Sequence, residues 1–185
     1  MMSLASARRW TAALLLVAAS AGCSHKSSSS QISSGLAPFS ATRNQAIGVV
    51  AHTKRSLGAA DVNTLAVAYT ALEEKANAYS SFMVEAVTTS SFDPARNAKY
   101  ASDLSKGIAD FNKSYDALEA IHRDVISGTW VTPFSQTLQG RWNQFNGMIA
   151  QMTPQTKADL IAGLKRETVW PNYEDIATEP IATTH

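Results

Sequence analysis

The chain lacks most residue patterns that mark a known chemistry. It has one cysteine in 185 residues, which excludes a disulfide framework and zinc sites of the usual two-to-four-cysteine kind. No charge of one sign predominates: after the first 22 residues there are 14 basic and 15 acidic residues, so nucleic acid is not an expected partner. Gly-rich phosphate loops, Gly-x-Ser-x-Gly and Cys-x-x-Cys-His are absent. We expect no catalytic activity and no cofactor.

Long hydrophobic runs are also missing, and the most apolar stretch lies near the N-terminus. Residues 12–19 follow Arg8 and Arg9 and lead into the small residues 20–22. Eight residues cover about 12 Å of helix, whereas the hydrocarbon core of a bilayer is about 30 Å thick. A basic start, a short apolar run and a small-residue exit are typical of a secretory signal peptide. The sequence therefore predicts a signal peptide over residues 1–22.

The single cysteine follows this stretch directly. Ser20-Ala21-Gly22-Cys23 resembles the lipobox of bacterial lipoproteins, although Leu is usual at the position of Ser20. The resemblance covers the first 24 residues. It implies that the Cys23 sulfur receives diacylglycerol, that the signal is cleaved before Cys23, and that acyl chains such as palmitate anchor the mature chain. The alternative is an ordinary secretory signal with an incidental cysteine.

The residue after the cysteine bears on the location. Ser24, in place of Asp, resembles the signal that sends a lipoprotein to the outer membrane, and it is the only hint that separates the outer from the inner membrane. Residues 24–35 hold seven serines and one apolar residue. Such a segment buries too little apolar surface to order itself. We therefore predict that the lipidated Cys23 and a flexible tether occupy residues 23–35.

Helical periodicity dominates the rest of the chain. Two segments carry apolar residues spaced alternately by three and four, which places them along one helix face. The first contains Val62, Leu65, Tyr69, Leu72, Ala76, Tyr79, Met83 and Ala86, with Asp61 as its expected N-cap. The second opens with Asp93-Pro94, contains Ala101, Leu104, Ile108, Phe111, Tyr115, Leu118, His122 and Val125, and is expected to end at Gly128.

These two segments are joined by a short link and predict a long antiparallel helical hairpin. Three shorter helices complete the cover: one over residues 41–57, one opening at Thr132-Pro133 and one opening at Thr153-Pro154. We therefore expect an all-α antiparallel bundle of four to five helices over residues 36–170. Residues 171–185 show no period and are predicted to be an irregular C-terminal tail, either a strap or a loose end.

Four aromatic residues are candidates for partner binding. If the helices alternate in direction, then Trp130, Phe134, Trp170 and Tyr173 gather at one pole of the bundle, with His122 about one turn below them. Such a cluster either closes the end of the bundle or binds a partner, since Trp and Tyr predominate in binding hot spots.

A metal site is a weaker hypothesis. Glu119 and His122 form one Glu-x-x-His motif, and di-iron carboxylate bundles need two. His122 is also explained as a residue near a helix C-terminus. His52 is the other histidine available to a metal or haem. The adjacent Glu73 and Glu74 diverge by about 100° around a helix and do not suggest a catalytic pair.

The predicted localisation and the predicted fold together define the expected function. We expect the protein to be lipid-anchored on the periplasmic face of the bacterial outer membrane. There it acts as a non-catalytic binding, scaffold or assembly component of the envelope. A secretion pilotin and an immunity protein are examples of this class, and an envelope protein is the expected partner. The alternative is a periplasmic metal- or haem-binding bundle that uses His52, Glu119 and His122.

Overall fold

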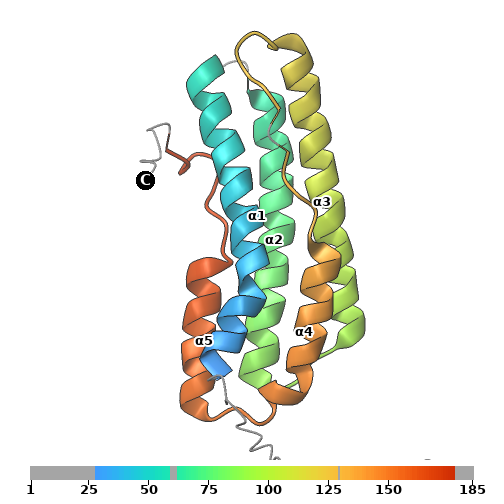
Figure 1. Ribbon diagram of the computed structural model, residues 1–185, viewed down its shortest axis with the longest axis vertical. Helices are drawn as coiled ribbons and strands as arrows, with labels where there is room; N and C mark the ends of the chain where they lie inside the picture. The colour runs from blue at the N-terminus through green and yellow to red at the C-terminus, as the bar shows by residue number, and fades with distance from the viewer. Residues whose placement is uncertain (1–27, 59–61, 129, 178–185) are drawn as a thin grey trace, which may run out of the picture.

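The computed structural model describes residues 28–58, 62–128 and 130–177. The described residues form five helices and no strand (Figure 1). The helices are α1 (Ser28–Leu57), α2 (Asn63–Thr89), α3 (Pro94–Ile121), α4 (Ser135–Ile149) and α5 (Pro154–Glu167). The predicted all-α bundle is confirmed. We call the end that holds the α2–α3 and α4–α5 links the lower pole, and the end that holds Leu57 and Ile121 the upper pole.

The hairpin of α2 and α3 is the centre of the bundle, and each helix is about 40 Å long. All eight positions predicted for the buried face of α2, from Val62 to Ala86, are buried. On α3 the predicted positions are buried as far as Leu118. Asp93 caps α3 as expected, because its carboxylate accepts the backbone N–H groups of Ala95 and Arg96. The predicted cap of α2, Asp61, lies outside the described residues.

The C-terminal end of α3 differs from the prediction. The helix ends at Ile121 instead of continuing to Gly128, and Val125 is 52% exposed. Side chains of the last helical turns hold the chain in its new direction. The Glu119 carboxylate accepts the Gly128 N–H at 2.7 Å, and the Tyr115 hydroxyl donates to the Ser127 carbonyl at 3.2 Å. Val125 therefore continues the apolar spacing in the sequence but does not belong to the buried face of α3.

Residues 122–128 and 130–134, which we together call the connecting strap, run back along α3 toward the middle of the bundle (Figure 1). Asn112 on α3 holds this strap through both atoms of its amide. Its Nδ2 donates to the Val131 carbonyl at 2.9 Å, and its Oδ1 accepts the Val131 N–H at 3.0 Å. Helix α4 consequently begins beside the middle of α3, not beside its end.

A second strap follows α5. Residues 168–177, the C-terminal strap, lie between α1 and α2 and rise from the middle of the bundle along α1 (Figure 1). Asn77 pairs with both backbone groups of Trp170, at 2.8 and 3.3 Å, in the same way that Asn112 pairs with Val131. Other donors reach the carbonyl groups of this segment: Arg43 to Val169, Tyr69 to Pro171, and Lys54 to Tyr173 and Ile176.

The predicted irregular tail is thus an ordered strap as far as residue 177, and residues 178–185 lie outside the described residues. Together the two straps replace helices in one half of the molecule. Five helices surround the core in the lower half, whereas three long helices and the two straps surround it in the upper half (Figure 1).

The N-terminal boundary of the bundle also differs from the prediction. Helix α1 begins at Ser28, so residues 28–35 are helical and do not belong to a tether. The reason is packing against α4: Gly35 and Leu36 are buried, and a Cβ atom at Gly35 would lie 2.5 Å from the Phe145 ring. Residues 23–27, including Cys23, lie outside the described residues.

Replacing Asn112 by Ala tests how the connecting strap is held. The variant leaves the buried N–H and carbonyl groups of Val131 without partners, so we expect the free energy of unfolding to fall by about 2–4 kcal/mol. Trypsin should also cleave faster after Arg123, which lies in the strap. Asn146→Ala, at an exposed position on α4, is the matched control and should change the free energy by less than about 0.5 kcal/mol. Equal unfolding curves for the two variants would contradict this role of Asn112.

Candidate functional site

Three of the four aromatic residues predicted to share a pole instead pack on rings of α1 and α2, between the middle of the bundle and its upper half. The rings of Phe134 and Trp170 contact the Phe39 ring edge-on, with centroid distances of 5.7 and 6.4 Å. The Tyr173 ring packs on Tyr69, at 6.2 Å. The prediction of a single pole is wrong because α4 begins, and α5 ends, halfway along the long helices (Figure 1).

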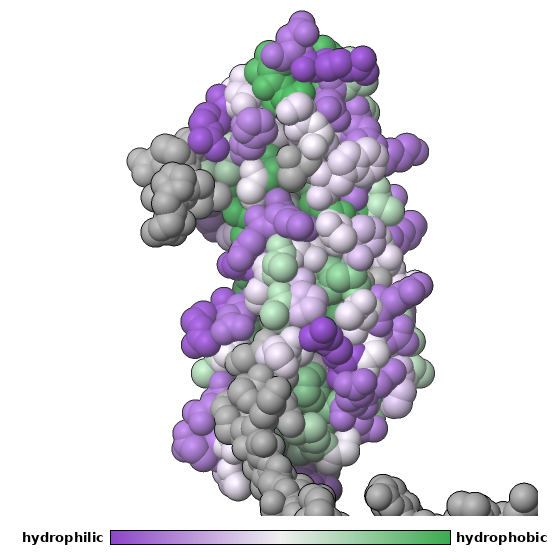
Figure 2. All heavy atoms as spheres, in the orientation of Figure 1, coloured by the Kyte–Doolittle hydropathy of each residue, from purple (hydrophilic) through white to green (hydrophobic). Residues whose placement is uncertain are grey.

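The fourth aromatic residue is separate from this cluster. Trp130 is 57% exposed and lies in the connecting strap, near the end of α3, whereas Trp170 is 2% exposed. Ile121 and Val125 are also exposed near the same end. Figure 2 shows hydrophobic residues at the upper end of the face drawn there, mixed with hydrophilic ones, and further hydrophobic residues in the middle and lower parts of the same face. Of the four candidates, Trp130 has the largest accessible surface for a partner.

The candidate metal ligands are not assembled into a site. His52 is exposed on α1, and His122 is the C-cap of α3, where its carbonyl accepts the N–H groups of Val125 and Ile126. The Glu119 carboxylate is engaged by the Gly128 N–H. Within residues 28–58, 62–128 and 130–177, no group of three or more His, Cys, Asp or Glu side chains is arranged to hold a metal ion.

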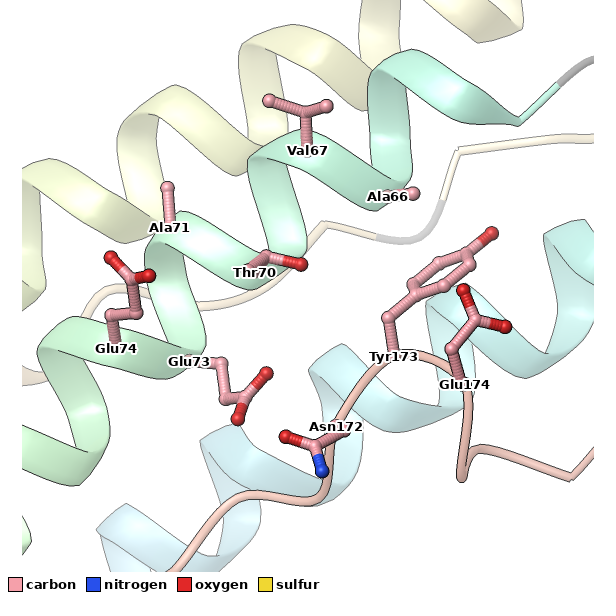
Figure 3. Close-up of a pocket in the computed structure, with 9 residues that line it drawn as sticks. All are labelled: Ala66, Val67, Thr70, Ala71, Glu73, Glu74, Asn172, Tyr173 and Glu174. Atoms are coloured by element: carbon pink, nitrogen blue, oxygen red, sulfur yellow. The ribbon is translucent and has the colours of Figure 1, made fainter.

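An open groove of about 510 Å³ lies between the upper half of α2 and the C-terminal strap (Figure 3). We call it the α2–strap groove. Its α2 side is formed by Ala66, Val67, Thr70, Ala71, Glu73 and Glu74, and its strap side by Asn172, Tyr173 and Glu174. The groove exists because Asn77 and Tyr69 fix the strap against α2 through Trp170 and Pro171.

The electrostatics of the groove are one-sided. Three carboxylates line it, from Glu73, Glu74 and Glu174, and no Lys or Arg does. Figure 3 shows Glu73 pointing from α2 toward Asn172, while Glu74 points away from the strap. Partial burial and the negative charges of Glu74 and Asp175 raise the pKa of Glu73. The groove consequently favours a positively charged ligand.

One wall of the groove has an unsatisfied polar atom. Tyr173 is 9% exposed, and its hydroxyl has no hydrogen-bond partner within the described part of the chain. Figure 3 shows the ring extending from the strap beside Ala66. Burial and the charge of Glu174 raise the pKa of this phenol, which therefore stays protonated and can donate. Lys54 covers the ring, with its Nζ atom 4.7 Å from the centroid.

Sequence reasoning did not find this groove. Glu73 and Glu74 are adjacent, and Glu174 lies a hundred residues later in a segment without periodicity. Only the contacts of the C-terminal strap with α2 bring them together, and no local sequence signal predicts those contacts.

Comparison with known proteins gives no further guide to the site. No family model, curated protein or solved structure matches the chain. None of the helices in the described residues combines the length and the apolar character that a membrane span requires. Function therefore has to be inferred from the residues and from the site that they form.

Proposed function

We propose that this chain is a bacterial lipoprotein of the outer membrane, with its helical bundle in the periplasm. The bundle acts there as a non-catalytic binding or assembly component of the envelope, as a secretion pilotin or an immunity protein does. The observation that carries the proposal is the position of Cys23, the single cysteine, directly after a basic start, a short apolar run and three small residues.

The start of α1 agrees with an anchor at this position. Four residues lie between Cys23 and Ser28, and a fully extended chain from one to the other spans at most about 18 Å. A lipid on Cys23 would therefore keep the first turn of α1, at the lower pole, close to the membrane surface. The α2–strap groove and Trp130 lie in the upper half of the bundle, where partners in the periplasm would have access to them.

Membrane fractionation of a Gram-negative host that expresses the full chain tests the proposal. Several acyl chains, at about 0.8 kcal/mol per buried CH₂ group, hold a protein stably in a bilayer. We expect the chain to sediment with the outer membrane on a density gradient and to be released by detergent but not by high salt. Recovery in the soluble periplasmic fraction would overturn the anchor, and recovery with the inner membrane would overturn the outer-membrane assignment.

A further inference from the structure

The C-terminal strap is held unevenly along its length. In its first part, the backbone of residues 169–171 is bonded to three side chains of α1 and α2, which are Arg43, Tyr69 and Asn77. Beyond Pro171, Lys54 is the one side chain of another element that bonds to the strap within the described residues. Proteins open first where fewest contacts hold them, so the last part of the strap is the part expected to detach first.

Residues 172–177 form a compact turn that Lys54 holds from α1. A backbone bond from the Ile176 N–H to the Tyr173 carbonyl, at 3.3 Å, closes the turn on itself. The Lys54 Nζ atom donates to the Tyr173 and Ile176 carbonyl groups at 3.1 and 3.0 Å, and it lies 4.7 Å from the centroid of the Tyr173 ring. Because the turn is bonded internally, it can move as one unit when the ammonium group releases it.

Charge on the α2 side opposes this contact. The turn carries Glu174 and Asp175, which are exposed and form no ion pair in the described part of the chain. Figure 3 shows Glu73 pointing from α2 toward Asn172, at the start of the turn. Partial burial and the negative charges of Glu74 and Asp175 raise the pKa of Glu73. Like charges on α2 and on the turn therefore repel each other.

Two buried side chains of the turn cover surface between α1 and α2. Tyr173 and Ile176 are 9% and 4% exposed, and the Tyr173 ring packs on the Tyr69 ring with centroids 6.2 Å apart. Detachment of the turn would expose these side chains together with the surface that they cover.

We propose that residues 172–177, which we call the flap, open as a unit by turning at Asn172 while residues 168–171 stay clamped. Lys54 is the latch that keeps the flap closed, and repulsion between Asp175 and Glu73 favours opening. The flap thereby controls access to the surface between α1 and α2 that it covers when closed. This device goes beyond the proposed function and does not depend on a lipid at Cys23.

Amide hydrogen exchange of the full chain in non-ionic detergent, resolved by residue, tests the proposal. The Ile176 N–H reports on the flap, and the Trp170 N–H, which donates to the Asn77 side chain, reports on the clamp. After correction for intrinsic rates, we expect Ile176 to exchange about tenfold faster than Trp170 or more. Equal protection of the two amides would overturn the proposal, because the strap would then open only as a whole.

Two charge variants should shift the opening in opposite directions. Lys54→Met keeps an apolar stem beside the Tyr173 ring and removes the ammonium group, so exchange at Ile176 should rise about thirtyfold while Trp170 is unchanged. Glu73→Gln removes the repulsion and should slow exchange at Ile176 about threefold.

Neighbouring residues provide matched controls for these variants. Arg55→Met removes an exposed cation next to Lys54, and Glu74→Gln removes a carboxylate that points away from the strap (Figure 3). Both should change the exchange rate at Ile176 by less than about 1.5-fold. Equal effects of Glu74→Gln and Glu73→Gln would overturn the role of repulsion. Faster exchange of both reporter amides alike in Lys54→Met would overturn the latch.

Acid should close the flap through the same pair of charges. The groups that face Glu73 are Glu74 and Tyr69 on α2 and Asp175 on the flap, while Arg43 of α1 faces Tyr69. Because the closed flap raises the pKa of Glu73, the closed state binds the proton more tightly, and this stabilisation is lost as the pH rises through the raised pKa. Between about pH 7 and about pH 5, the corrected exchange rate of the flap amide relative to the clamp amide should therefore fall. A fall of the same size in Glu73→Gln would contradict this mechanism.

Discussion

Trp170→Ala is expected to lower the free energy of unfolding by about 3–5 kcal/mol. Trp170 is among the largest fully buried side chains, and its ring contacts Phe39 on α1 and Tyr69 on α2. Removal of the indole leaves a cavity where the C-terminal strap enters the bundle. The indole Nε1 atom makes no hydrogen bond with any residue that the structure describes, so the loss is one of packing. Urea unfolding followed by circular dichroism measures it.

Trp130→Ala is the matched control for this variant. It removes the same side chain from a position that is 57% exposed, and the expected change is within about 0.5 kcal/mol. If the two variants were equally stable, Trp170 would not hold the strap in the core. If Trp130→Ala were the less stable of the two, the connecting strap would be packed differently from the arrangement described above.

Cys23→Ser is expected to abolish membrane association of the chain. The hydroxyl of Ser cannot form the thioether to diacylglycerol, so the variant loses all its acyl chains, and the described residues offer no membrane-spanning helix in their place. Fractionation of cells should find the variant outside the membrane fraction. Its unfolding curve should match that of the native chain released by detergent, because Cys23 precedes α1.

The neighbouring substitution Ser24→Ala controls for this effect. It leaves the sulfur in place and should keep the chain in the membrane fraction. Continued membrane association of Cys23→Ser would show that the anchor lies elsewhere. Loss of association in Ser24→Ala as well would show that the substitutions disturb export instead of the attachment of lipid.

The helices were largely predictable because a helix that is buried on one face carries apolar residues at a regular spacing of three and four. All eight positions that the alternation of three and four residues identified from Val62 to Ala86 are buried, and the Asp93-Pro94 and Thr153-Pro154 pairs marked two helix starts within one residue. In both cases the side chain that precedes the proline accepts a backbone N–H of the first turn.

The straps were not predictable, because side chains distant in sequence hold them. Asn112 and Asn77 provide the backbone of Val131 and Trp170 with partners that a neighbouring strand would otherwise provide. An asparagine inside a helical segment carries no sign of that role. The apolar periodicity also predicted that α3 continues beyond Ile121, because Val125 keeps the spacing of three and four residues. The α2–strap groove depends on the same contacts and was missed for the same reason.

The start of α1 was misplaced for a different reason. Serine-rich composition favours disorder in isolation, but Gly35 and Leu36 find a packing surface on α4, where Phe145 lies against Gly35. Tertiary contact thus stabilises a helix that local composition does not favour. The anchor proposed at Cys23 is correspondingly closer to the bundle than a tether over residues 23–35 would place it.

The mass of the N-terminal fragment of the native polypeptide is the most direct test of the lipid anchor. We predict that the mature chain begins at Cys23 and that its first fragment is heavier than its sequence by a diacylglyceryl group and a further acyl chain. A fragment that carries Cys23 with a free thiol, or one that still contains residues 1–22, would contradict the assignment of this protein as a lipoprotein.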